Sequence, residues 1–327
     1  MNQGWTYCDR IQPKSAGLTV LDYYTRCYVH SSAAEWRARI EQGQILVDGE
    51  RVQAQTVLSK GNRLSYYRLP WEEPTVPLDF EVLYEDAHLW VVAKPSGLPV
   101  LPGGGFLEHT LLHQLRSRYP NEQPIPVHRL GRGTSGAMLI AKSQVARAQL
   151  ARQFRVRTAS YDSSVTPAES PQTLTKIYRA LIGPVDGPVD GAVDGAVDGA
   201  GDRFTYTYPI GKLPHVKIGY IYGHSPTGLP SRSECRIVER RADSTLVDVS
   251  ISTGRPHQIR IHLAAGGYPL LGDPLYPVGG APAEDCVALP GDCGYHLHAH
   301  RLRFAHPDTG DAIAVEATPP EILRAGF

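Results

Sequence analysis

The stretch RLPWEEPTVP, from Arg68 to Pro77, is the feature that most constrains the fold of this chain. Proline has no backbone N–H to donate and biases the preceding residue away from helical geometry, so neither a helix nor a central strand is expected to run through this stretch. A chain of 327 residues is long enough for one large and one small unit. We therefore predict a small N-terminal unit with its linker at residues 1–77 and a larger domain at residues 78–327.

Local signals in the N-terminal part predict a short helix followed by a hairpin. Ser31 or Ser32 as the cap, with Glu35 following, gives a capping-box pattern, and Gly43 is placed to end the helix. In ILVDGERV, the pair Asp48-Gly49 separates two apolar runs, which is a strong hairpin signal. The run WRARIEQGQILVDGERV resembles an S4-type RNA-binding module, which would be a small α/β unit. The alternative is a helix–hairpin unit without that function.

Strand and helix patterns intermix in the larger part of the chain. Apolar alternation or apolar runs predict strands at residues 80–84, 89–93 and 246–252 and in YHLHAHRLRFAHP, and KPSG at Lys94–Gly97 predicts a tight turn. A helix is predicted to follow GRPHQ and to end at Gly266-Gly267. The order lacks a regular βαβ alternation. We therefore expect an α+β fold rather than a doubly wound sheet.

A second helix is predicted from Ser143, with this serine as its cap. Its buried face is predicted to consist of four residues at helical spacing: Val145, Ala148, Ala151 and Phe154. Two segments after it, at about 158–174 and 184–203, look like inserted loops. The first is rich in Ser, Thr and Pro, and the second repeats VDG, a composition too polar to pack a core. Calcium binding by this repeat is disfavoured, because its period is wrong.

The formal net charge is zero, but the charge is unevenly distributed. Between His113 and Arg157 one acid, Glu122, stands among nine basic residues: Arg116, Arg118, Arg129, Arg132, Lys142, Arg147, Arg152, Arg155 and Arg157. Such a local field can bind phosphate even when the total charge is neutral, because exposed charges more than about 10 Å apart are largely screened. The alternative is an arginine-rich helix face that contacts only solvent.

The remaining composition predicts a cytoplasmic protein. No run of apolar residues is long enough for a membrane span, and the first residues, MNQGWTYCDR, lack the pattern of a secretory signal. The five cysteines are scattered and lack CxxC spacing, so reduced thiols are expected.

Two loops carry most of the residues suited to chemistry. HRLGRGTSG, from His128 to Gly136, combines a basic pair, glycines and two hydroxyls, but it contains no carboxylate and no cysteine. GRPHQIRIH places Arg255, His257 and Arg260 around a predicted helix start, where free N–H groups attract anions. Both loops carry arginines and both need unusual backbone geometry. This coincidence favours a shared cleft that binds phosphate or carboxylate.

HLHAH aligns three histidines with alternate positions of one predicted strand: His296, His298 and His300. That spacing is compatible with a metal site, but neither Cys286 nor Cys293 has a familiar ligand spacing relative to them. We favour a strand whose histidines make ordinary hydrogen bonds, with no metal.

The run from KPSG through HRL, TSGAMLIAKS, KIYRAL and TGRPHQIRIHLAAGGYPLLGDPLY to LHAHRLRFAHP resembles the RluA-type RNA pseudouridine synthases over about residues 78–327. The resemblance implies an α+β domain of pseudouridine synthase type with a mixed, largely antiparallel sheet. It implies an enzyme that flips a uridine out of ribosomal or transfer RNA, detaches the base from the ribose and rejoins it through carbon. No cofactor and no obligate protein partner are implied.

The resemblance also implies roles for individual residues. Arg129 matches the arginine that takes the place of the flipped base, and Tyr178 the tyrosine that stacks on the uracil. Arg260 matches the basic residue that pairs with the catalytic carboxylate. Ile261 and Leu263 would form a pocket wall. Four further residues would contact phosphate or sugar: Lys94, Arg132, Arg255 and His257.

The sequence departs from the family pattern at one position. The family has HRLD, whereas this chain has Gly131, which offers neither a proton acceptor nor a nucleophile. An unpaired buried Arg260 would be costly, which suggests a visiting anion: a displaced carboxylate or an RNA phosphate. Three functions stay open. They are an active synthase with a substitute acid, a non-catalytic RNA-binding or RNA-chaperone protein, and, remotely, a zinc hydrolase at HLHAH.

Overall fold

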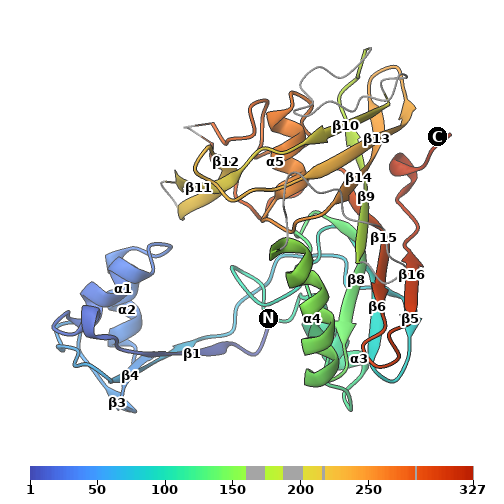
Figure 1. Cartoon of the computed structure of the whole chain (residues 1–327). Helices are drawn as coiled ribbons and strands as arrows, with labels where there is room; N and C mark the ends of the chain where they lie inside the picture. The colour runs from blue at the N-terminus through green and yellow to red at the C-terminus, as the bar shows by residue number, and fades with distance from the viewer. Residues whose placement is uncertain (160–173, 187–201, 216–217, 284–285, 327) are drawn as a thin grey trace. The chain divides into compact units, whose positions relative to one another are not determined.

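A computed structural model describes residues 1–159, 174–186, 202–215, 218–283 and 286–326, with residues 156–159 described by their backbone. Most of the two predicted insertions lies outside these residues. The chain divides into two compact units, residues 1–74 with 214–220 and residues 75–213 with 221–327 (Figure 1). In the described residues no helix is both long and apolar enough to cross a membrane.

The first unit is a small sheet with two helices. Its antiparallel strands, in the order β1-β4-β2-β3, are Trp5–Arg10, Arg63–Arg68, Ile45–Val47 and Glu50–Arg51. Helices α1 (Val20–Cys27) and α2 (Ala33–Glu41) lie on the same side of this sheet, after a 3-10 turn at Pro13–Ser15 (Figure 1). Trp36 of α2 is buried against the sheet residues Ile45 and Tyr66. This one-sided packing buries an aromatic core in the small unit.

Both local signals predicted in this unit are confirmed. The Ser32 side chain accepts a hydrogen bond from the Glu35 backbone, and the Glu35 carboxylate accepts one from the Ser32 backbone in return. The hairpin turns at Asp48 and Gly49, both in the left-handed region with φ of 52° and 92°. Such a turn requires two successive positive φ angles, which explains the Asp-Gly pair.

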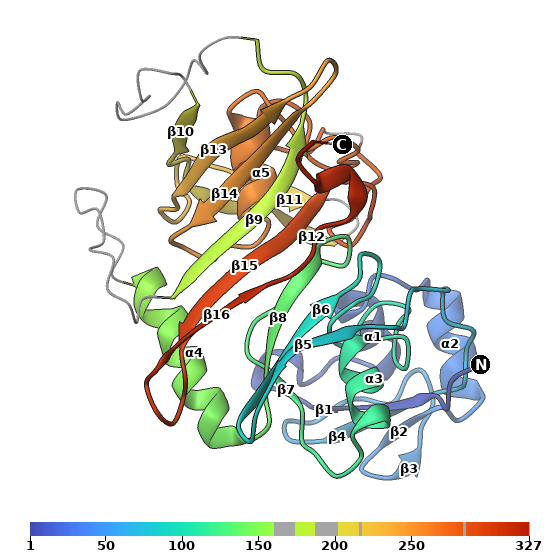
Figure 2. The same ribbon diagram turned by 90° about the vertical axis from the view of Figure 1, so that its right-hand side faces the viewer.

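The second unit is built on a ten-stranded sheet with the order β10-β13-β14-β9-β15-β8-β6-β5, on which β16 pairs with β15 and β7 with β8 (Figure 2). The strands in chain order from β5 to β10 are Glu81–Glu85, Leu89–Lys94, Ile125–Pro126, Ser135–Ala141, Thr175–Ile182 and Arg203–Tyr206. From β13 to β16 they are Ser233–Arg240, Thr245–Ile251, Leu297–Ala305 and Ala312–Glu316. Strands β11 (Ile210–His215) and β12 (Gly219–His224) form a separate pair.

The described strand pairs of the large sheet are antiparallel except for β8 with β15, which run parallel. The expected α+β class with a mixed, largely antiparallel sheet is confirmed. The parallel pair has a structural consequence, because the chain enters β8 and β15 at the same edge of the sheet. The segments that precede these two strands are therefore brought side by side.

Helices cover both faces of the sheet, which explains the continuous apolar runs of its central strands. One face of β6 and β8, with Trp90 and Met138, packs against α3 (Leu111–Arg118). The opposite face, with Val91 and Leu139, packs against α4 (Gln144–Ala159). Helix α5 (Gln258–Ala265) packs on the β9–β14–β13 part of the sheet, and a 3-10 turn (Glu321–Leu323) lies near the end of the chain.

The predicted buried face of α4 is wrong, although the cap at Ser143 is confirmed by its hydrogen bond from the Ala146 amide. Val145 is 73% exposed, and the helix instead buries Ala146 and Leu150 and packs Phe154 against them. These three residues follow i, i+4, i+8 spacing and include Leu150, the larger apolar residue. Burial of leucine outweighs burial of the smaller valine, because more apolar surface leaves water.

Candidate active site

The two arginine-bearing loops meet at one edge of the large sheet. The parallel register pairs His298 with Ser135 and Ala299 with Gly136. The loop at 128–134, which precedes β8, therefore lies beside the segment 290–295, which precedes β15. Lys94 ends β6 directly opposite Gly136. Both HRLGRGTSG and α5 contact the segment 290–295, because Arg132 donates to the Gly291 carbonyl and Arg260 donates to the Pro290 carbonyl.

Gly136 makes the close approach of β8 and β15 possible. Its φ is +108°, and a Cβ atom at this position would lie 2.3 Å from the Ala299 carbonyl oxygen. Both the backbone angle and the space therefore require glycine. The neighbouring Ser135 hydroxyl is 2.8 Å from Nδ1 of His298, which fastens the end of the loop to β15.

Two residues, His128 and Lys94, fix the position of the loop 128–136 by hydrogen bonds to the backbone. The Nε2 atom of His128 accepts a hydrogen bond from the Leu139 amide (3.2 Å), and its ring stacks on Phe154. Burial lowers the pKa of His128 to about 3, so the ring is neutral at pH 7. The Lys94 ammonium donates to the carbonyls of Pro95, Leu98 and Arg132, and burial lowers its pKa to about 7. Lys94 is 1% exposed and lies beneath the loop rather than on its surface.

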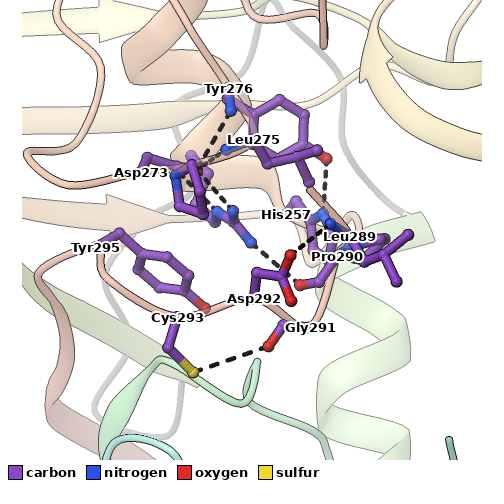
Figure 3. Close-up of polar contacts among 12 residues, drawn as sticks. His257, Asp273, Leu275, Tyr276, Leu289, Pro290, Gly291, Asp292, Cys293 and Tyr295 are labelled. Atoms are coloured by element: carbon purple, nitrogen blue, oxygen red, sulfur yellow. Dashed lines mark hydrogen bonds and ion pairs between the residues drawn. The ribbon is translucent and has the colours of Figure 1, made fainter. Parts of the chain in front are cut away.

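Arg260 forms a buried, bidentate ion pair with Asp273. Its Nε and Nη2 atoms donate to the two carboxylate oxygens at 2.7 Å each, and the side chains are 3% and 1% exposed. Asp273 also accepts hydrogen bonds from the amides of Leu275 and Tyr276 (Figure 3). Of the two anions suggested for Arg260, the structure shows a carboxylate from another segment, Asp273, so no RNA phosphate is needed to neutralise the guanidinium. Because the Asp273 carboxylate is 1% exposed and already paired with Arg260, it is poorly suited to serve as a substitute base.

The segment before β15 covers both Arg260 and the glycine loop. Arg132 donates from Nε to the Gly291 carbonyl at 2.6 Å, and Arg260 donates to the Pro290 carbonyl at 3.3 Å. The ring of Tyr295 lies over the Arg260 guanidinium, 4.1 Å from Cζ to the ring centroid. Its hydroxyl lies 3.3 Å from Oγ1 of Thr134 in the loop. Figure 3 shows Tyr295 with Cys293 and Asp292 on this segment.

The start of α5 is set by an unusual backbone angle. His257 has φ of 56°, and its Nδ1 lies 2.6 Å from the Tyr276 hydroxyl (Figure 3). This hydroxyl itself donates to the Tyr222 carbonyl. Because the phenolic proton is already used, Nδ1 of His257 carries the proton. Burial lowers the pKa of His257 to about 4. At neutral pH the remaining ring nitrogen, Nε2, can therefore accept a hydrogen bond from a ligand, but the ring offers neither a second donor nor a positive charge.

The other predicted site residues occupy distinct environments. Arg129 is exposed and makes no polar contact with the described part of the chain. Arg255 donates to the Pro230 carbonyl at 3.1 Å. Tyr178 pairs with Ala299 on β15 and packs against both central core clusters, and burial raises its pKa to about 12. Ile261 and Leu263 are fully buried in two different core clusters, where they support α5.

The histidines of HLHAH make ordinary hydrogen bonds. His298 contacts the Ser135 hydroxyl and the Ala317 carbonyl, and His300 contacts the same carbonyl. These contacts occupy both ring nitrogens of His298. Among the residues that the structure describes, no group of three His, Cys, Asp or Glu side chains could hold a metal ion.

Two residues of this site were not singled out as such from the sequence. Asp273 lies in the GDPLY stretch of the family resemblance, but its ion pair with Arg260 was not foreseen. Tyr295 gave no signal, because it precedes a strand and belongs to no recognised motif. Its contacts with Thr134 and Arg260 join segments far apart in the chain.

The buried neutral histidines predict acid sensitivity. Burial lowers the pKa of both His262 and His298 to about 4, below the ordinary value of 6.5. As the pH falls below about 6.5, these histidines bind protons in the unfolded chain before they do so in the folded chain. The free energy of unfolding therefore decreases between about pH 6.5 and pH 4. Each group contributes about 1.4 kcal/mol per pH unit. The H298N variant should show a shallower loss of unfolding free energy between pH 7 and pH 5 in urea titrations; an unchanged slope would contradict this.

The sequence from residue 88 to residue 265 matches the family model described as RNA pseudouridylate synthase. The chain is 46% identical to an uncharacterized RNA pseudouridine synthase of Synechocystis sp., over 93% of this chain and 95% of that protein. It is 40% identical to RNA pseudouridine synthase 5 of Arabidopsis thaliana, over 99% and 95%. It is 30% identical to ribosomal large subunit pseudouridine synthase D of Neisseria meningitidis, over 90% of this chain and 72% of that protein.

A solved structure of human RNA pseudouridylate synthase domain containing 1 shares the fold, with a TM-score of 0.50, 23% identity and coverage of 76% of this chain and 86% of that chain. The predicted resemblance is thus confirmed by sequence and by fold. The match to the family model runs from β6 to the end of α5 and includes the loop 128–136, whereas the segment 290–295 and β15 lie beyond it. The chain therefore belongs to the RNA pseudouridylate synthase family.

Proposed function

We propose that this RNA pseudouridine synthase flips one uridine out of a structured RNA and isomerises it at the sheet edge between the loop 128–136 and α5. In that reaction the N1–C1′ bond breaks and a C5–C1′ bond forms, while the base loses the proton on C5 and gains one on N1. Substrate and product have the same atoms and oxidation state. The chain therefore needs no cofactor for this chemistry.

One observation carries the proposal: the parallel pairing of β8 with β15 brings the arginine loop, the start of α5 and Tyr178 to a single edge. Taking a base out of a stack costs a few kcal/mol and leaves a gap. Arg129 is exposed and makes no polar contact within the described residues, so its side chain is available to fill that gap. Tyr178 supplies the ring that stacks on the uracil.

The remaining residues bind and position the nucleotide. Arg260 is the paired, immobile cation of the site. We assign Arg132 and Arg255 to phosphate contacts and His257, whose free Nε2 accepts a hydrogen bond, to a sugar hydroxyl. Lys94 acts through the loop that it holds, and Ile261 and Leu263 fix α5 and thereby Arg260.

We assign the substrate to ribosomal or transfer RNA and the protein to the cytoplasm, without an obligate protein partner. The relative from Neisseria, named for the ribosomal large subunit, favours ribosomal RNA as the first substrate to test. The small N-terminal unit, with its S4-like helix and hairpin, is proposed as a second RNA contact. RNA of both classes is folded, and such recognition relies on shape.

The Arg129→Ala variant tests the function and the flipping role together. Wild-type chain incubated with ribosomal and transfer RNA fractions should form new pseudouridine, detected by carbodiimide-blocked primer extension. Arg129→Ala should lower turnover about 10- to 100-fold, because an unfilled gap raises the cost of flipping. The exposed Arg303 on β15 gives a matched control, Arg303→Ala, which should retain full turnover.

Product formation by the wild type decides between the two open functions. If RNA is retained in a salt-dependent way but neither fraction gains pseudouridine, the chain is a non-catalytic RNA-binding protein. If Arg129→Ala is as active as wild type, the assigned flipping role is wrong while the activity stands.

A further inference from the structure

The two glycines of HRLGRGTSG that stand outside the TSG motif, Gly131 and Gly133, are not required by backbone geometry. Neither has a positive φ, in contrast to Gly136. A Cβ atom at Gly131 would lie 2.8 Å from the hydroxyl oxygen of Tyr295. A Cβ atom at Gly133 would lie 2.9 Å from Cε1 and Cζ of the same ring. Both glycines are therefore needed for one reason, which is the close approach of Tyr295.

Tyr295 is held in this position by packing. Its side chain is buried, and it belongs to the core cluster that includes Leu263 and contacts Tyr178. The Arg260 guanidinium, fixed by Asp273, lies against its ring. Figure 3 shows the Tyr295 ring directed along the segment 290–295 toward Cys293. The ring is thus buried with Arg260 against it.

The hydroxyl of Tyr295 retains hydrogen-bonding capacity. Its one partner among the described residues is Oγ1 of Thr134, at a long 3.3 Å, whereas a phenol can donate once and accept twice. Burial raises the pKa of Tyr295, so the group is neutral at pH 7. Gly131, in contact with it, is exposed. The neutral hydroxyls of Tyr295 and Thr134 thus lie next to Gly131, an exposed residue of the loop 128–136.

We propose that Tyr295 is a substrate-contacting residue of this synthase, and that its hydroxyl occupies the place of the side chain missing at Gly131. There it donates a hydrogen bond to an oxygen of the flipped nucleotide, while Thr134 accepts or donates beside it. No covalent bond to the enzyme is formed at this position. This assignment rests on the proposed function, because it needs a flipped nucleotide above Gly131.

The Tyr295→Phe variant removes the hydroxyl and keeps the ring against Arg260. Its kcat for pseudouridine formation should fall about 100- to 1,000-fold, which is the scale for loss of one preorganised donor, with unchanged RNA affinity. The matched control is Tyr206→Phe in the same core cluster. The Tyr206 hydroxyl is buried without a hydrogen-bond partner in the described structure, so its removal should leave kcat unchanged.

A second pair of variants tests the contact itself. Gly131→Ala should lower Tm, because its Cβ meets the Tyr295 hydroxyl, and Tyr295→Phe added to it should restore most of that loss. Wild-type kcat in Tyr295→Phe, or strictly additive Tm changes in the double variant, would overturn the assignment of Tyr295 while leaving the function intact. Absence of pseudouridine with the wild-type chain would overturn both.

Discussion

Replacing Asp273 with alanine is expected to lower the free energy of unfolding by about 3–5 kcal/mol, because it leaves the buried Arg260 guanidinium without its partner. Arg260 is 3% exposed and cannot turn to water without disrupting α5. The carboxylate also accepts the Leu275 and Tyr276 amides, which would become unpaired. Urea unfolding of the variant and the wild type, under conditions where both are two-state, measures this difference.

The Asp273→Ala variant should lose more turnover than its unfolded fraction alone would explain. Arg260 supports the Tyr295 ring, so a shift of about 1 Å in either can cost about 100-fold in turnover. If Asp273→Ala does not fold, the isosteric Asp273→Asn variant, which keeps the shape of the site, replaces it in the activity measurement. The control is Glu234→Ala, which breaks the exposed pair with Arg232 and should cost less than about 1 kcal/mol. Similar losses of unfolding free energy for Asp273→Ala and Glu234→Ala would show that the buried ion pair stabilises the fold no more than an exposed one.

Gly136→Ala is the second substitution with a large expected effect. Its Cβ would lie 2.3, 2.7 and 2.8 Å from three backbone atoms of Ala299, which cannot yield as a flexible side chain can. The strain of a non-glycine residue at φ +108° adds about 1–2 kcal/mol. We expect a total loss of about 3–5 kcal/mol in unfolding free energy, together with loss of pseudouridine formation, because overpacking pushes β8 away from β15.

Gly267→Ala separates backbone strain from steric overlap. Gly267 has φ of +92°, similar to that of Gly136, but nothing lies within 4 Å of a Cβ atom built on it. Its substitution should therefore cost only the strain, about 1–2 kcal/mol, and leave activity unchanged. Equal destabilisation by the two glycine substitutions would refute the close β8–β15 contact as the cause.

The fate of Gly131 illustrates why one missing residue did not settle the function. From the sequence, the glycine appeared only as the loss of a carboxylate. In the structure it belongs to an arrangement with Gly133 and Tyr295, in which a hydroxyl fills the space. The loop thus packs around the Tyr295 hydroxyl, and Arg260 pairs with a carboxylate from another segment.

Interactions within a few residues were predictable from the sequence. The capping box at Ser32, the Asp48-Gly49 hairpin and the apolar run of β6 depend on backbone angles and hydrogen bonds that neighbouring residues decide. The ordered motifs likewise determined the family and, with it, the class of fold. The buried face of α4 was not predictable, because it depends on which sheet the helix covers.

The contacts of the site were decided only by the tertiary structure. Tyr295 meets Thr134 and Gly131 because β15 lies parallel to β8, a pairing between strands about 160 residues apart in the chain that no local pattern encodes. Asp273 meets Arg260 because the loop after α5 folds back over that helix. Sequence thus determined which chemical groups this protein carries, whereas the strand order decided which of them touch.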